Sequence, residues 1–329
     1  MKTRHLAGHA VNPIGYGCMS LSHAYGVPPA PEDGARMLHR ALDLGYTHLD
    51  TARLYGLGAN ETLIGEALKG RRSQYVLASK CGIEFDGDKR RIDCRPDTIR
   101  TAVEKSLTAL QTDHIDLYYL HRRDFETPIE ESIGALADLV AAGKIGAIGL
   151  SEMSADTLRR AHAVHPVAAM QTEYSLWSRN PEIAVLATCA ELGCAFVAFS
   201  PVARGVFANG VRDPDALVAS DLRRSQPRFN AENWPHNLQL VDRFNTLAAS
   251  LDITPAQLAL AWVLSRGEHV IAIPGTASVA HLEENVRARD IELSGETIDR
   301  LDSLINRHTV AGPRYSAAMQ RAIETEEFA

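Results

Sequence analysis

Eight short apolar segments, separated by longer segments with helical periodicity, alternate along this 329-residue chain. Continuous apolar character is typical of strands that are buried on both faces of a parallel sheet. Eight strand–helix units in about 290 residues favour a closed (β/α)8 TIM barrel with right-handed crossovers over an open sheet. We therefore predict one barrel domain over residues 1–329. The strand-like segments are IGYGCM (14–19), YTHLD (46–50), YVLASK (75–80), IDLYYLH (115–121), IGAIGL (145–150), VAAMQ (167–171), CAFVAFS (194–200) and VIAIP (270–274).

The intervening segments carry helix signals. Apolar residues recur at helical spacing, and glycines such as Gly45 and Gly143 mark helix ends. Pro96 lies near a helix start, and Ser154 is a candidate N-cap residue. The predicted helices cover residues 32–45, 95–111, 128–143, 154–165, 181–193, 236–253 and 254–267.

Two segments are longer than a barrel connection needs. The first runs from Pro201 to about Pro235 after the seventh strand and is rich in Arg, Asn, Asp and Pro. The second follows Ile305 and begins NRHTVAGPRYSAAMQ. Long connections in compact domains usually carry function. We expect both segments on the C-terminal face of the barrel, where the tail could cover a pocket.

Charge, cysteine content and hydropathy argue against several classes of function. A net charge of −7 with dispersed basic residues argues against a nucleic-acid surface, and pairs such as Arg122-Arg123 usually belong to a solvated face. Because Arg122 and Arg123 follow His121, contact with a polar substrate is the alternative for this pair. The five cysteines form no CxxC motif, so we expect neither disulfides nor a metal site. MKTRHLAGHA lacks the apolar core of a signal peptide, and Glu191 interrupts the longest apolar stretch. We therefore expect no membrane span and a reduced, cytoplasmic location.

Four chemically active residues stand at or just past the ends of three consecutive strands. They are Asp50, Tyr55, Lys80 and His121. The carboxyl ends of neighbouring parallel strands meet at one edge, so these side chains can come together. A Lys ammonium about 4 Å from a phenol could lower the phenol pKa by about three, toward the working pH of a general acid. Histidine could donate a hydrogen bond to a carbonyl oxygen. The set therefore predicts carbonyl chemistry.

Each of the four residues also has an ordinary structural interpretation. A tyrosine after a strand usually packs, a strand-end lysine is usually a surface charge, and a buried histidine is more often a core residue than a catalyst. The joint arrangement makes coincidence harder to accept. Lys80 on a barrel strand would also suit a Schiff-base lyase, but Asp50 and Tyr55 favour a lysine that stays charged.

Motifs along most of the chain resemble the aldo-keto reductase superfamily, in the bacterial and plant branch with YxLHR and IPGT…LEEN. The motifs appear in order from about residue 11 to 305: GYGCM, LDTARLYG, NETLIGEAL, LASK, IDLYYLHR, AGKIGAIGLSE, MQTEYSLWSR, SPVARG and IPGT…LEEN. The resemblance implies a (β/α)8 barrel that binds NADPH without a Rossmann fold, and the chain indeed has no GxGxxG between a strand and a helix. It further implies a catalytic tetrad of Asp50, Tyr55, Lys80 and His121, with Tyr55 as the proton donor in aldehyde or ketone reduction.

The resemblance also implies binding residues. Ser151 and Gln171 match contacts to the nicotinamide amide, Phe199 matches the aromatic residue on the nicotinamide ring, and the loop from Ser200 matches the one along the pyrophosphate. The implied cofactor set is Gly17, Cys18, Asp50, Ser151, Gln171, Phe199, Ser200, Pro201, Ala203, Arg204, Gly205, Ile273, Gly275, Thr276, Ser278, His281, Glu284 and Asn285. The expected substrate set is Met19, Tyr25, Tyr55, His121 and Trp177.

Two positions depart from the family pattern. Relatives usually have Asn where this chain has Glu152, and a carboxylate cannot donate the hydrogen bond that an amide donates. One nicotinamide contact is therefore expected to be lost, rotated or made through a protonated acid. Relatives also place Lys or Arg near the 2′-phosphate, whereas no Lys or Arg lies between Ile273 and Asn285. Hydroxyls and helix N-terminal amides can bind phosphate with less charge. NADPH is the expected cofactor, and NADH is the alternative.

The sequence is compatible with several functions. A small-molecule carbonyl compound is the expected partner, and a bulky xenobiotic ketone is as compatible as a small aldehyde. The family works reversibly, so an alcohol or sugar dehydrogenase is an alternative. A non-enzymatic cofactor-sensing subunit is a further alternative, although the tetrad is complete. The sequence carries no signal for an oligomeric state.

Overall fold

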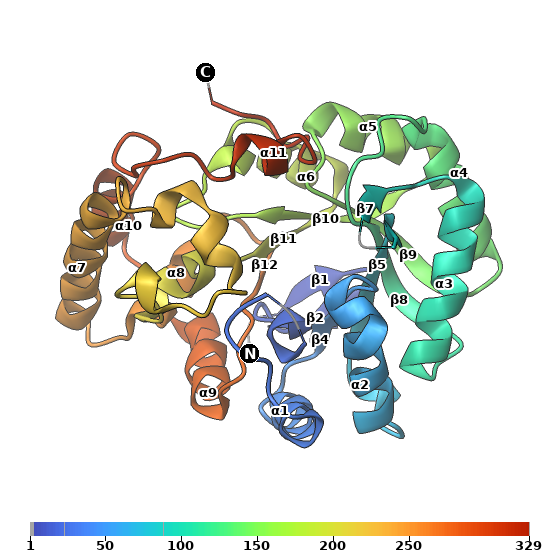
Figure 1. Ribbon diagram of the computed structural model, residues 1–329, viewed down its shortest axis with the longest axis horizontal. Coiled ribbons are helices and arrows are strands. Elements are labelled where there is room, and N and C mark those ends of the chain that lie inside the picture. Colours follow the sequence, from blue (N-terminus) through green and yellow to red (C-terminus); the bar gives the residue numbers. More distant parts are fainter. Residues whose placement is uncertain (1–2, 23, 88, 329) are drawn as a thin grey trace.

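The protein folds as a closed ring of parallel strands surrounded by helices (Figure 1). The computed structural model describes residues 3–22, 24–87 and 89–328. The sheet order is β12-β11-β10-β9-β8-β5-β4-β3, and all neighbours are parallel. All eight predicted strands are present, so the predicted (β/α)8 barrel is confirmed. Their bounds are β3 Tyr16–Gly17, β4 His48–Asp50, β5 Val76–Cys81, β8 Ile115–Leu120, β9 Ile145–Ser151, β10 Val167–Glu173, β11 Ala195–Phe199 and β12 Val270–Ile273.

The ring closes between its first and last strands. Gly15 N donates to Ala272 O at 2.8 Å, and Gly17 N donates to Pro274 O at 3.2 Å. A Cβ on Gly17 would lie 2.7 Å from the carbonyl oxygen of Ile273, so the close approach at this seam requires glycine. The first strand is shorter than the predicted 14–19, because the chain turns into a 3-10 helix over Cys18–Leu21.

The helices pack around the ring and match every predicted helical segment, with shifts of a few residues at the ends. Ser154 caps α5 as predicted, since its hydroxyl accepts from Thr157 N at 3.2 Å. The helices are α1 Pro31–Asp43, α2 Ala59–Ala67, α3 Pro96–Leu110, α4 Ile129–Ala141, α5 Ala155–Val164, α6 Val185–Leu192, α7 Trp234–Ser250, α8 Pro255–Leu264, α9 Val279–Arg287, α10 Gly295–Leu304 and α11 Ala317–Gln320.

A hairpin of β1 Arg4–Leu6 and β2 His9–Val11 plugs the N-terminal end of the barrel. Its Leu6 and Val11 pack in one cluster with Val76 and Ala195, which stand at the starts of β5 and β11. Burying this apolar end leaves the opposite end of the strands available for a site, as is usual for this fold.

The two long segments are ordered rather than extended loops. The first contains short 3-10 helices at Ala203–Ala208, Pro214–Ala216, Leu222–Ser225 and Pro227–Phe229. The second leaves α10, passes through α11 and returns toward α6 (Figure 1). A further hairpin, β6 Ile83–Asp86 with β7 Lys89–Ile92, follows β5 and was not anticipated.

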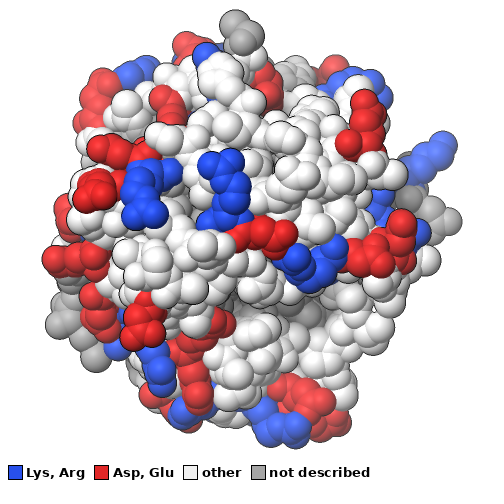
Figure 2. Space-filling view, turned by 90° about the vertical axis from the view of Figure 1, so that its left-hand side faces the viewer, with Lys and Arg blue, Asp and Glu red and all other residues white. Residues whose placement is uncertain are grey.

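Acidic and basic side chains are interspersed on the face shown in Figure 2. This mixed pattern differs from the broad positive areas that nucleic-acid-binding proteins present. Among the described residues, no single helix has the length and apolar character needed to cross a membrane. The bent pair α7 and α8, with an angle of 87° between them, meets those criteria by length and composition alone.

Candidate active site

The four predicted catalytic residues meet at the C-terminal ends of β4, β5 and β8. The buried Lys80 ammonium contacts the Asp50 carboxylate and donates to the carbonyl oxygen of Thr51 at 2.7 Å. The same ammonium lies 5.3 Å from the centroid of the Tyr55 ring and hydrogen bonds the Tyr55 phenol. The Tyr55 and His121 rings meet edge to face with centroids 6.1 Å apart. The residues therefore form one connected cluster.

The electrostatics of Tyr55 differ from the expectation. Burial raises the pKa of Tyr55, and the Lys80 ammonium, which acts in the opposite sense, does not offset it. Lysine alone therefore does not bring this phenol to neutral pH. Burial destabilises the phenolate more than the Lys80 ammonium stabilises it. The Asp50 carboxylate destabilises the phenolate further by charge repulsion. Tyr55 is consequently a neutral phenol, the form that can donate a proton.

Lys80 and His121 have defined charge states as well. Burial lowers the pKa of Lys80, but Asp50 and Tyr55 raise it by a larger amount. The pKa of Lys80 therefore lies above its usual value, and the amine stays charged. Burial, followed by the Arg122 guanidinium, lowers the pKa of His121 well below its usual range. His121 is therefore a neutral imidazole with one N–H to donate.

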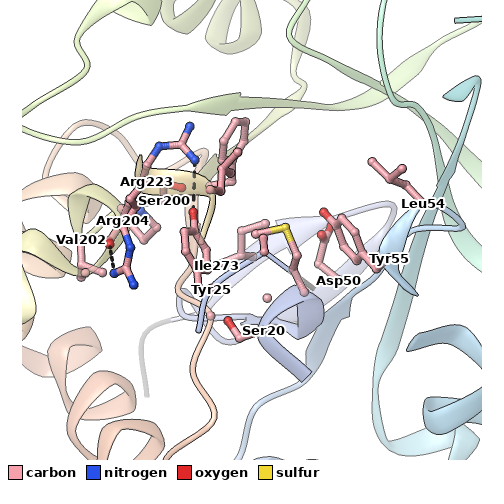
Figure 3. Close-up of a pocket in the computed structure, with 18 of the residues that line it drawn as sticks. Ser20, Tyr25, Asp50, Leu54, Tyr55, Ser200, Val202, Arg204, Arg223 and Ile273 are labelled. Atoms are coloured by element: carbon pink, nitrogen blue, oxygen red, sulfur yellow. Dashed lines mark hydrogen bonds between the residues drawn. The ribbon is translucent and has the colours of Figure 1, made fainter. Parts of the chain in front are cut away.

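Tyr55 and His121 line a cavity of about 820 Å³ at this end of the barrel. Figure 3 shows Asp50, Leu54 and Tyr55 on one side of it and Tyr25 with Arg204 and Arg223 on the other. Fifteen of the eighteen predicted cofactor residues line this cavity: Gly17, Asp50, Ser151, Gln171, Phe199, Ser200, Pro201, Arg204, Gly205, Ile273, Gly275, Thr276, His281, Glu284 and Asn285. Of the predicted substrate residues, Met19, Tyr25, Tyr55 and His121 line it.

Four predicted residues lie elsewhere. Cys18 and Ala203 are buried beneath the cavity wall, and Ser278 stands at the N-terminus of α9 without lining the cavity. Trp177 is packed against aromatic neighbours, with its ring stacked on Phe229 at a centroid distance of 6.1 Å. It faces a second, smaller hollow, so the structure does not place it beside Tyr55.

The wall between β9 and β10 is held in place by the tetrad. Gln171 Nε2 donates to Asp50 Oδ2 at 2.7 Å, which fixes its amide and ties β10 to β4. Ser151 lies beside it in the cavity wall, and its hydroxyl is 3.4 Å from Arg122 Nη1. Phe199 closes the wall at the end of β11. A polar edge with a phenyl ring beside it suits a flat heteroaromatic amide.

Comparison with known proteins identifies the family. The profile of the aldo/keto reductase family matches residues 13–306. The chain belongs to this family. It is 42% identical to an aldo-keto reductase from Glycine max over 310 residues, covering 94% of this chain and 89% of the relative. It is 43% identical to the aldo-keto reductase yakc [NADP(+)] of Schizosaccharomyces pombe over 320 residues, covering 95% and 94% of the two chains.

Solved structures agree with this placement. The glycerol dehydrogenase AKR11B4 from Gluconobacter oxydans superposes with a TM-score of 0.85 at 26% identity, covering 99% of this chain and 98% of that one. An aldo/keto reductase from Klebsiella pneumoniae, solved with NADP and acetate, has a TM-score of 0.73 at 30% identity, with 96% and 99% coverage. The resemblance seen in the sequence motifs is confirmed, and with it the class of NAD(P)H-dependent oxidoreductases.

Glu152, where reductases of this family usually have Asn, turns away from the cavity. Its backbone has a left-handed φ of +56°, and its buried carboxylate accepts from Arg314 Nη2 at 2.7 Å and from Thr325 Oγ1 at 2.9 Å. It also accepts from Glu173 N at 2.9 Å. Glu152 therefore anchors the C-terminal segment, which lies about 160 residues later in the chain.

Arg204 has a similar second role. Its guanidinium donates to Glu173 at 2.5 Å, to the Tyr25 hydroxyl at 3.1 Å and to the Tyr315 hydroxyl at 2.9 Å. Although burial raises the pKa of Glu173, Arg204 and Arg314 lower it to about 2, so this carboxylate is charged. Arg204 thus clamps three segments of the cavity rim together. Its contact with a pyrophosphate stays a prediction.

Other cavity residues were not anticipated. Leu54 precedes Tyr55, Arg90 and Ile92 come from the β7 hairpin strand, and Tyr315 and Met319 come from the C-terminal segment. The sequence signal for the tail was its length beyond Ile305. The hairpin had no comparable signal, because the alternation around KRRI is short and mostly charged.

Proposed function

We propose that this chain reduces the carbonyl group of an aldehyde or ketone with NADPH, and that Tyr55 donates the proton. The observation that carries the proposal is the buried Lys80–Asp50 ion pair beneath Tyr55 at the floor of the cavity. Removing two charges from water costs free energy that their mutual attraction often does not recover. A buried ion pair therefore indicates a role other than stability. Here it places a positive charge next to the Tyr55 phenol, which lines the cavity.

The residues divide the work of proton transfer. The substrate carbonyl oxygen accepts hydrogen bonds from the Tyr55 hydroxyl and from the neutral His121 imidazole. Tyr55 then gives its proton to that oxygen, and the alcohol leaves uncharged. The negative charge that remains on the phenol is stabilised by the Lys80 ammonium. Asp50 and the Thr51 carbonyl oxygen hold the ammonium in place.

The cavity fits a long dinucleotide. It extends from Tyr55 past Phe199 and Gly205 to Thr276 and Asn285 on the α9 side. NADPH supplies the hydride to the carbonyl carbon when it is bound along this wall. The relatives with NADP in their names or structures support NADPH as the first choice.

The reverse reaction is the second candidate. The similarity to the glycerol dehydrogenase of Gluconobacter oxydans favours it. Oxidation of an alcohol needs Tyr55 as a phenolate, which the raised pKa disfavours at neutral pH. Reduction is therefore the direction we propose for neutral conditions.

Binding titration followed by turnover tests the proposal. NADPH and NADH are titrated by fluorescence, and a panel of aldehydes and ketones is then assayed with the tighter-binding cofactor. We expect saturable NADPH binding and reduction of at least one class of carbonyl compound. Tight cofactor binding with no turnover across the panel would favour a sensing subunit. Trapping of a substrate on Lys80 by borohydride would favour a lyase.

A further inference from the structure

Two arginine side chains stand beside His121 at the catalytic end of the cavity. Arg122 directly follows the catalytic histidine, and Arg90 comes from the β7 hairpin strand. Both line the same cavity as Tyr55. Burial is the main cause of the lowered pKa of His121, and the positive charges of Arg122 and Arg90 lower this pKa as well. They are therefore neighbours of the reacting centre.

Among the described residues, the charged side chains that line the rest of the cavity pair with opposite charges, except for Glu284 on α9. Arg204 pairs with Glu173, Arg223 with Asp221 at 2.7 Å, and Arg91 with Asp93 at 3.0 Å. Asp50 pairs with Lys80 in the tetrad. These pairs leave little net charge around most of the cavity wall.

Arg90 and Arg122 differ from this pattern. Arg122 Nη1 donates to the His121 carbonyl oxygen at 2.6 Å and lies 3.4 Å from the Ser151 hydroxyl, and neither is a carboxylate. Arg90 pairs through its backbone with Phe85 in the β6–β7 hairpin, but within residues 3–22, 24–87 and 89–328 its guanidinium has no hydrogen-bond or ion-pair partner. Burial and then the Arg122 guanidinium lower the pKa of Arg90, as expected for two positive groups that share a partly enclosed space. An anion placed between them would remove this repulsion.

The surrounding side chains are mainly apolar. Ile92 lies two residues from Arg90 on the same hairpin strand, and Leu54, Met319 and Ile323 line the same cavity. Such walls suit a hydrocarbon or aromatic body. Guanidinium groups bind carboxylates through paired hydrogen bonds, and this geometry gives both affinity and orientation.

We propose that Arg90 and Arg122 bind the carboxylate of an amphipathic carbonyl substrate, one with an apolar body and an acid group, and hold its aldehyde or ketone toward Tyr55. The inference rests on the proposed carbonyl reduction and narrows its substrate class. It adds no chemical step, because the carboxylate only orients the substrate.

A matched substrate pair tests this inference. 4-Carboxybenzaldehyde carries the acid, and methyl 4-formylbenzoate has nearly the same shape without the charge. Each is titrated into the enzyme–NADP⁺ complex by calorimetry, and each is assayed for NADPH-dependent reduction. We expect the acid to bind at least 10-fold more tightly than the ester and to show the lower KM. Equal binding of the two compounds would overturn the inference, whether or not either is turned over.

Variants of the two arginines test whether they cause the preference for the acid over the ester. Arg122→Met and Arg90→Met should each weaken binding of the acid about 10-fold or more. Because Arg122 also lies 3.4 Å from Ser151, only Arg90→Met is expected to keep ester and NADPH binding within about 2-fold. Arg122→Lys should recover part of the preference, because it keeps the charge but loses the paired geometry. Lys89→Met removes a positive charge from the same strand outside the cavity and should leave the preference intact. If the acid preference survives both methionine variants, these arginines are not its source.

The outcomes separate this inference from the proposed function. Reduction of both compounds without an acid preference leaves the reductase proposal standing and removes the arginine proposal. Acid-selective binding without turnover of any carbonyl compound supports the arginine site and removes the reductase proposal. The two failures therefore cannot be confused.

Discussion

Glu152 and Arg314 form a buried salt bridge that fastens the C-terminal segment across the mouth of the barrel. The carboxylate and guanidinium atoms are 2.7 Å apart, and both side chains are almost fully enclosed. The segment beyond Arg314 then supplies Tyr315 and Met319 to the cavity. Near its end, Glu324 accepts from Ser154 N and Thr157 Oγ1 at the start of α5. A residue expected at the nicotinamide thus shapes the other wall of the site.

Removing the carboxylate should loosen this segment. Glu152→Gln removes the carboxylate that pairs with the buried Arg314 guanidinium, which costs about 3 kcal/mol of folding stability. Urea unfolding and limited proteolysis after residue 305 measure the effect. We expect faster cleavage of the tail and a larger rise in substrate KM than fall in kcat. The control is Glu283→Gln, which breaks a surface pair with Arg40 and should change stability by less than about 1 kcal/mol. Similar behaviour of the two variants would rule out a special role for Glu152.

The raised pKa of Tyr55 sets the pH dependence of the two directions. Reduction needs the protonated phenol, which is lost only as the pH rises through that raised pKa. We therefore expect kcat for reduction to stay level from about pH 6 to above pH 9, and kcat for alcohol oxidation to rise over the same range. Steady-state profiles in both directions check this. A decline in reduction already near pH 7 would show that the phenol titrates much lower than its burial indicates.

A second buried histidine predicts acid sensitivity. Burial lowers the pKa of His48 to about 4, and neither of its ring nitrogens has a hydrogen-bond partner among the described residues. The unfolded chain binds a proton at this residue below about pH 6.5, whereas the folded protein does so only near pH 4. Stability should therefore fall by about 3 kcal/mol as the pH drops from 6.5 to 4. His48→Asn should flatten this part of a curve of unfolding free energy against pH, and an unchanged slope would assign the loss to other groups.

Cofactor selectivity should respond to charge near α9. His281 lines the cavity close to Thr276, and their side chains are 3.4 Å apart. No Lys or Arg lies between Ile273 and Asn285 to meet a 2′-phosphate. His281→Arg is therefore expected to tighten NADPH binding about 5- to 10-fold and to leave NADH binding nearly unchanged. Fluorescence titration at two salt concentrations measures both. An equal gain for NADH would mean that the new charge does not meet the 2′-phosphate.

The sequence could predict those site residues whose positions follow from the ends of the strands. Asp50, Lys80 and His121 close apolar strands, and parallel strands of one barrel bring their ends together. The roles of Glu152 and Arg204 depended on partners that no local pattern reveals. Arg314 and Tyr315 reach them from a tail without periodicity.

The protonation of Tyr55 was also beyond sequence reasoning. The number of charged neighbours could be counted from the motif, but the loss of solvation depends on how completely the pocket encloses the ring. Burial decides the direction of the pKa shift here, against the effect of Lys80. Trp177 shows the same limit, since its packing partner Phe229 comes from the long segment after β11.

Single-turnover oxidation of NADPH by wild type and Tyr55→Phe tests the central claim most directly. An aldehyde that the wild type reduces is mixed with each enzyme–NADPH complex, and NADPH binding is measured separately. Because a positioned general acid contributes about 100-fold or more, Tyr55→Phe should slow hydride transfer by at least that factor while the NADPH Kd changes less than about 3-fold. A variant that oxidises NADPH at the wild-type rate would show that Tyr55 is not the proton donor.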